Sequence, residues 1–154
     1  MEGYLADAVD EIKRVDHLLY VSLKYTRTVD VIKSVIERIL NAFDFVILEL
    51  LEHAKEKKII TEYPNTPGMK VNTLKKAFSE NQELADYLDF YLLLRRVSRA
   101  DVTRREEYRR HVTMIASLDS GSVMEIDIDK LTEYYKKTKK FLEFADKIVN
   151  PKDD

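Results

Sequence analysis

Residues 45–51 read FVILELL, and this stretch decides the predicted fold. It lies inside a run from about residue 29 to Lys58 whose apolar side chains recur at three- and four-residue steps, the spacing of an α-helix. These side chains are Val31, Val35, Ile39, Ala42, Phe43, Val46 and Leu50. A helix that is apolar on most sides must be covered on most sides, by neighbouring helices or by a second subunit. The chain is therefore predicted to form a helical bundle around this segment.

The segments on either side predict further helices. Residues 2–24 carry an apolar stripe at helical spacing, and YPNTPG at residues 63–68 breaks the chain before helix resumes near Asn72. Ser79 and Gln82 match a capping box, in which two side chains satisfy free backbone N–H groups at a helix start. A helix is therefore predicted to begin there and to run through YLDFYLLLRRV.

The C-terminal third predicts two more helices. Thr103 and Glu106 match a second capping box, which predicts a helix over residues 104–118. A turn, DSGS, and a short alternating piece, VMEIDID, follow, and Asp127 or Asp129 then caps a last amphipathic helix. The expected fold is an all-α, up-and-down bundle of four to five helices that forms one domain over residues 1–154.

Composition argues against several kinds of function. The chain has no cysteine, so it has no disulfide, thiolate metal site or thiol nucleophile. No glutamate lies three residues before any of the three histidines, a spacing that carboxylate-bridged di-metal sites use, so neither a metal ion nor another cofactor is expected. The N-terminus is acidic and amphipathic, and the longest apolar run is too short to span a bilayer. We expect a cytoplasmic protein without a membrane partner.

The arginines are concentrated in one segment. RRVSRADVTRREEYRRH, residues 95–111, holds seven of the ten arginines and one of the three histidines, although the whole chain has a net charge of −2. Arg104 and Arg105 would occupy the first turn of the predicted helix, where the helix dipole is already positive and disfavours cations. The arrangement becomes favourable when an anion such as phosphate binds there.

Helical spacing would place Arg104, Tyr108 and His111 on one face, with Glu107 four residues before His111 and able to orient its ring. A histidine beside an arginine is typical of sites that transfer protons and stabilise phosphate. The other arginines of the segment would widen this face into an RNA-binding surface on which Tyr108 stacks with a base: Arg95, Arg96, Arg99, Arg109 and Arg110. The alternative is an ordinary solvated face whose arginines pair with nearby carboxylates.

An arginine four to six residues before a histidine, near the start of a late helix in a small α-helical bundle, resembles the HEPN (higher eukaryotes and prokaryotes nucleotide-binding) superfamily. Arg105 precedes His111 with five intervening residues, and Arg104 with six. The following HVTMIASLDSGSVMEIDIDKLTEYYKKTKKFL resembles the HEPN toxins of toxin–antitoxin modules in its order of apolar stretch, Ile-Asp piece and final helix. The resemblance implies a HEPN-like bundle that forms a homodimer and binds RNA or a nucleotide, with metal-independent RNA cleavage in active members.

Carried onto this sequence, the resemblance implies that His111 acts as general base or acid on a ribose 2′-OH, while Arg104 or Arg105 holds the scissile phosphate. The toxin form has Asn directly after the motif arginine and Tyr two residues beyond the histidine, where this chain has Glu106 and Thr113. These departures put modification by a nucleotidyltransferase partner in doubt. The expected function is RNA or nucleotide binding, with endoribonuclease activity as its catalytic form. The alternative is a non-catalytic scaffold or oligomerisation module that docks an acidic protein through its arginine-rich face.

Overall fold

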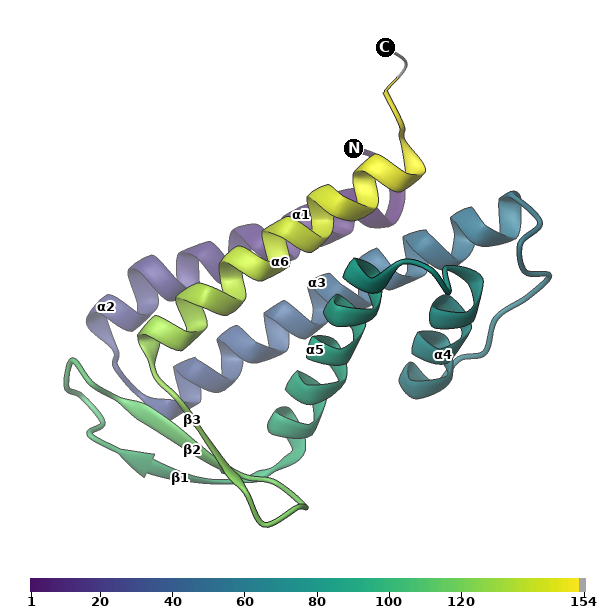
Figure 1. Ribbon diagram of the computed structural model, residues 1–154. Helices are drawn as coiled ribbons and strands as arrows, with labels where there is room; N and C mark the ends of the chain where they lie inside the picture. The colour runs from purple at the N-terminus through teal and green to yellow at the C-terminus, as the bar shows by residue number, and fades with distance from the viewer. Residues whose placement is uncertain (153–154) are drawn as a thin grey trace.

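The computed structural model describes residues 1–152; residues 153 and 154, the end of the predicted domain, lie outside them. The helix predicted around FVILELL is present as α3, Val29–Glu56. Helices α1 (Gly3–His17), α5 (Gln82–Arg99) and α6 (Ile128–Val149) pack against it, as does the short α4 (Pro67–Ala77) (Figure 1). Thirteen side chains of α3 are buried. Because the chain's own helices cover them, the apolar pattern of α3 does not by itself require a second subunit.

Polar side chains determine where three of these helices begin. Thr28, Asn81 and Asp127 each accept a hydrogen bond from the backbone N–H three residues further on, at 3.3, 3.0 and 2.9 Å, and so cap α3, α5 and α6. The predicted cap of the last helix is thereby assigned to Asp127. The capping box predicted at Ser79 is wrong by two residues, because the Asn81 side chain caps α5 instead and that helix begins only at Gln82.

The first predicted helix, over residues 2–24, is confirmed as a helical segment, but it is not α-helical along its whole length. After His17 the chain continues through one turn of π-helix, η1 (Leu18–Ser22), and then α2 (Leu23–Tyr25). A π-turn adds one residue to the helical repeat and often occurs at functional sites. It shifts the side chains that follow around the helix axis, and Tyr20 and Val21 are exposed there.

The prediction of an all-α bundle is wrong between residues 101 and 126. The predicted helix over residues 104–118 is absent, and the chain forms a three-stranded antiparallel sheet in the order β1-β2-β3. The strands are β1 (Asp101–Arg105), β2 (Thr113–Ser117) and β3 (Val123–Ile126). The sheet lies at the end of the bundle where α5 ends and α6 begins (Figure 1).

Alternating burial explains why this segment is extended. On β2 and β3, Met114, Ala116 and Ile126 are buried against the helices, while Ser117 and Glu125 on the other face are exposed. This period of two suits a sheet with one buried face, and strand pairing replaces the helix predicted over residues 104–118. The predicted turn DSGS is confirmed between β2 and β3, where Gly121 adopts a left-handed φ of 81°.

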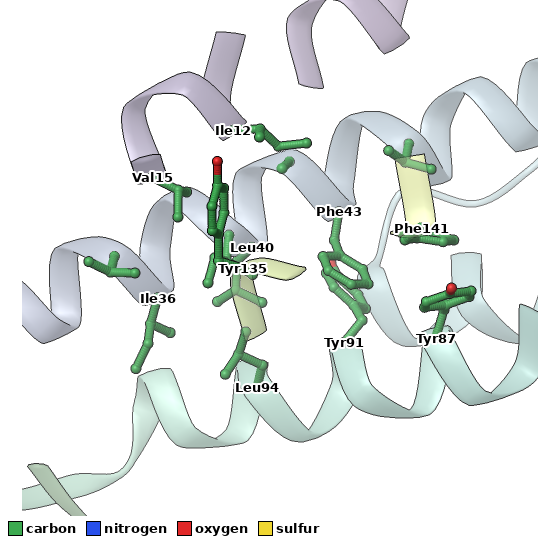
Figure 2. Close-up of a cluster of buried hydrophobic side chains, with 14 of the residues drawn as sticks. Ile12, Val15, Ile36, Leu40, Phe43, Tyr87, Tyr91, Leu94, Tyr135 and Phe141 are labelled. Carbon is green, nitrogen blue, oxygen red and sulfur yellow. The ribbon is translucent and has the colours of Figure 1, made fainter. Parts of the chain in front are cut away.

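Aromatic rings from three helices meet in the core (Figure 2). The ring centroids of Phe43 on α3 and Phe141 on α6 are 4.7 Å apart, and Phe141 also stacks on Tyr87 of α5 at 4.9 Å. Tyr91 of α5 lies 6.0 Å from Phe43 on another side. All four residues are buried, so the core joins α3, α5 and α6 through offset aromatic contacts.

Candidate anion-binding site

The arginine segment is divided among three elements. Arg95, Arg96 and Arg99 end α5, Arg104 and Arg105 end β1, and Arg109, Arg110 and His111 lie in the loop of residues 106–112. A five-residue strand spans roughly 17 Å, so the arginines of α5 and those of the loop lie at opposite ends of β1. The predicted common helix face of Arg104, Tyr108 and His111 is wrong, because this segment is not helical.

Neighbouring residues of a strand point to opposite faces of the sheet, and this separates Arg104 from Arg105. On the buried face, the guanidinium of Arg104 donates to Oδ1 of Asp30 at 3.0 Å and to Oε2 of Glu107 at 3.3 Å. The hydrogen bond to Asp30 is the main cause that raises the pKa of Arg104. On the exposed face, Arg105 forms an ion pair with Glu125 of β3. Both arginines predicted to hold a scissile phosphate are thus paired with carboxylates.

Glu107 fastens the loop of residues 106–112 to the start of α3. Its Oε2 accepts a hydrogen bond from the backbone N–H of Val29 at 3.0 Å, and the backbone N–H of Tyr108 donates to the carbonyl of Arg27 at 2.6 Å. A carboxylate at this position satisfies a free backbone N–H group and also interacts favourably with the helix dipole. No hydrogen bond links Glu107 to His111 within residues 1–152, so the predicted orienting contact is replaced by this anchor.

The loop is held in a strained conformation. Glu106 and Tyr108 have φ angles of 53° and 66°, in the left-handed region that disfavours side chains by about 1 kcal/mol or more each. The contacts of Glu107 and of the Tyr108 backbone with the start of α3 hold this conformation. Tyr108 is 78% exposed, and Arg109, Arg110 and His111 are exposed after it. Strained loops that project side chains into solvent are often functional.

A small pocket lies between the loop and the start of α6. It has a volume of about 260 Å³, and its polar side chains come from three parts of the chain: Arg27, Arg110, His111, Asp127 and Asp129. Within the described residues, the buried Nε of Arg27 has no hydrogen-bond partner. Arg104 and Arg105 do not line this pocket, and their predicted catalytic role with His111 stays a prediction.

Sequence reasoning identified Arg110 and His111 but not Arg27. That arginine precedes α3 by two residues, and its sequence context indicates only a break between two helices. It becomes part of the site because the loop docks on the Arg27 carbonyl. In the part of the chain that the structure describes, no group of three or more His, Asp or Glu side chains is arranged to hold a metal ion, and no helix has the length and apolar character needed to cross a bilayer.

Comparisons of this chain with protein-family models, with curated proteins and with solved structures found no match in any of the three. The HEPN resemblance therefore rests on the sequence alone, and its motif does not lie at a helix start here, because Arg104 and Arg105 end β1 and His111 lies in the loop.

Proposed function

We propose that the protein binds RNA through the loop of residues 106–112 and the pocket beside it. The observation that carries this proposal is the run Tyr108-Arg109-Arg110-His111, which is exposed on a loop fastened to α3. Among the ion pairs of residues 1–152, none involves Arg109 or Arg110, whereas Arg104 and Arg105 are both paired. Arginines without a carboxylate partner are the ones available to neutralise phosphates.

The chemistry of the loop suits RNA better than it suits a simple anion. An exposed aromatic ring beside arginines is the combination that single-stranded nucleic-acid binders use, with base stacking on the ring and phosphates on the guanidinium groups. The pocket combines Arg27, Arg110 and His111 with Asp127 and Asp129. The carboxylates would repel free phosphate, but they can accept hydrogen bonds from ribose hydroxyls or base amino groups. A nucleotide of an RNA strand offers all of these groups together.

The same proposal extends to RNA cleavage and to a homodimer, both of which the HEPN resemblance implies. Cleavage requires an arginine near His111 at the scissile phosphate, and within one chain Arg27 and Arg110 share its pocket. A second copy facing the loop would bring its own arginines to that site. Incubation of labelled single-stranded RNA with the protein in EDTA, followed by gel analysis, tests the cleavage. Loss of any cutting activity in His111→Ala would assign it to this site.

Binding is tested by fluorescence anisotropy of a labelled single-stranded RNA at several salt concentrations. The loop variant Arg109→Gln/Arg110→Gln is compared with Arg96→Gln/Arg99→Gln, which removes the same charge from the end of α5. For single strands the slope of log K against log salt is about −0.7 per neutralised phosphate, so losing two contacts reduces it by roughly 1.4. Among the described residues, Arg96 and Arg99 also lack an ion pair, but they end α5 at the opposite end of β1 from Tyr108 and the pocket, so we expect this reduction in the loop variant alone. Equal binding by the loop variant and the wild type would contradict the proposal.

No RNA binding at low salt, with a stable dimer in sedimentation, would favour the protein-docking scaffold.

A further inference from the structure

A second group of basic side chains lines a groove between α1 and α3. The groove has a volume of about 590 Å³, within the usual range for small-molecule sites, and shares no lining residue with the pocket beside the loop. Its basic side chains come from both helices: Lys13, Arg14 and His17 from α1, and Arg38 from α3. We infer that this groove binds the phosphate or pyrophosphate group of a small molecule.

A buried carboxylate holds the two arginines of the groove together. Glu11 is only 8% exposed, and its carboxylate accepts from Arg14 at 3.4 Å and from Arg38 at 3.3 and 3.4 Å. One negative charge between two guanidinium groups leaves one positive charge unbalanced, and Lys13 and Glu37 add one charge of each sign. The side chains of Arg14 and Arg38 remain 59% and 39% exposed, so both guanidinium groups can be reached by an anion. Because Glu11 already holds them in place, little side-chain entropy is lost when an anion binds both.

The polar face of α3 coincides with this groove. Ser34 lies three and four residues before Glu37 and Arg38, and Asn41 lies four and three residues after them, which places all four on one side of α3. The π-turn η1 begins directly after His17, at the edge of the groove, and such turns are frequent at functional sites. The exposed amide of Asn41 offers further hydrogen-bond donors to phosphate oxygens.

Isothermal titration calorimetry with sodium pyrophosphate at low salt tests the inference. Asn41→Asp places a negative charge in the groove without disturbing Glu11, and Asn72→Asp makes the same change at an exposed position of α4. We expect Asn41→Asp to lower the affinity at least tenfold and Asn72→Asp to leave it unchanged. Equal affinity in both variants, or no binding by the wild-type protein, would overturn the inference.

Arginine variants locate the bound pyrophosphate independently. Arg14→Gln/Arg38→Gln should abolish binding, while Arg109→Gln/Arg110→Gln, which removes the same charge from the loop, should retain it. Because Arg14→Gln/Arg38→Gln leaves Glu11 buried without a partner, the fold of this variant is checked by circular dichroism. If it does not fold, the comparison of Asn41→Asp with Asn72→Asp decides. Loss of binding in the loop variant alone would place pyrophosphate at the loop and refute the groove as its site. RNA binding is expected to weaken in Arg109→Gln/Arg110→Gln and not in Arg14→Gln/Arg38→Gln. The proposed RNA site and the proposed pyrophosphate site are therefore tested independently.

Discussion

The carboxylate of Glu107 accepts a hydrogen bond from the backbone N–H of Val29 at 3.0 Å, although 78 residues separate them in the chain. This contact joins the exposed loop to the first turn of the longest helix, and Arg104 donates to the same carboxylate oxygen at 3.3 Å. The loop that carries the proposed RNA-binding side chains is therefore positioned by the start of α3.

Replacing Glu107 with alanine should release this anchor. Loss of a side chain that satisfies a helix N-terminus typically costs about 0.5–2 kcal/mol, and we expect a decrease of that size in the free energy of unfolding, measured by urea denaturation. The amide of Val29 should also exchange faster with deuterium. Glu106→Ala is the matched control, because Glu106 is exposed and makes no side-chain hydrogen bond within residues 1–152. A similar effect of both variants would argue against a specific anchor.

Tyr108→Ala should weaken RNA binding without affecting stability. Tyr108 is 78% exposed, so removal of its ring costs the fold little, whereas loss of a base-stacking contact is worth about 1–3 kcal/mol of binding free energy. Anisotropy titrations should show this loss for Tyr108→Ala, while Tyr108→Phe, which keeps the ring, should bind as the wild-type protein does. Unchanged affinity in Tyr108→Ala would exclude stacking on this ring.

Phe43→Ala should destabilise the protein severely. Its fully buried ring contacts Phe141 and Tyr91, and removal of a buried phenylalanine costs about 3–5 kcal/mol. Urea denaturation followed by circular dichroism measures the change. Tyr25→Ala is a suitable control, because this aromatic side chain is 79% exposed and its loss should change stability by less than about 0.5 kcal/mol. Comparable losses in the two variants would mean that the aromatic cluster does not form the core.

The stability contributed by Asp44 should depend on pH. Burial is the main cause that raises the pKa of this carboxyl above its usual 3.8, even though the hydroxyl of Tyr91 donates a hydrogen bond to it. The folded protein therefore binds this proton more tightly than the unfolded chain does. The stabilising contribution is complete below pH 3.8 and is lost as the pH rises through the raised value.

Asp44→Asn removes this titration. Relative to the wild-type protein, the variant should become progressively more stable as the pH increases from 3.8, and the difference should level off above the folded-state pKa. Urea denaturation at a series of pH values measures this difference, with the exposed Asp119→Asn as control. A difference that stays constant, or that changes in the opposite direction, would show that burial does not dominate at Asp44.

Local patterns predicted most of the helical part correctly. The apolar period around FVILELL, the break at YPNTPG and an acidic cap at Asp127 or Asp129 all act over a few residues, so they can be recognised in the sequence. The helix after the break begins at Pro67, five residues before the predicted restart near Asn72. The same kind of pattern led to a wrong prediction at residues 103–106. There a capping box and helix-forming residues indicate a helix, whereas burial of Met114 and Ala116 against the bundle stabilises a strand.

By itself the sequence determined the long central helix, its apolar covering and an exposed run of arginines ending in His111, because each depends on residues close together in the chain. Tertiary structure alone decided which arginines remain available. Strand alternation directs Arg104 and Arg105 to opposite faces and into ion pairs, and docking on α3 brings Arg27 to the loop. Arg38 in the groove is likewise held by Glu11, which is buried on a neighbouring helix. Such pairs join residues that are far apart in the chain and close in space, so the spacing of neighbouring residues does not predict them.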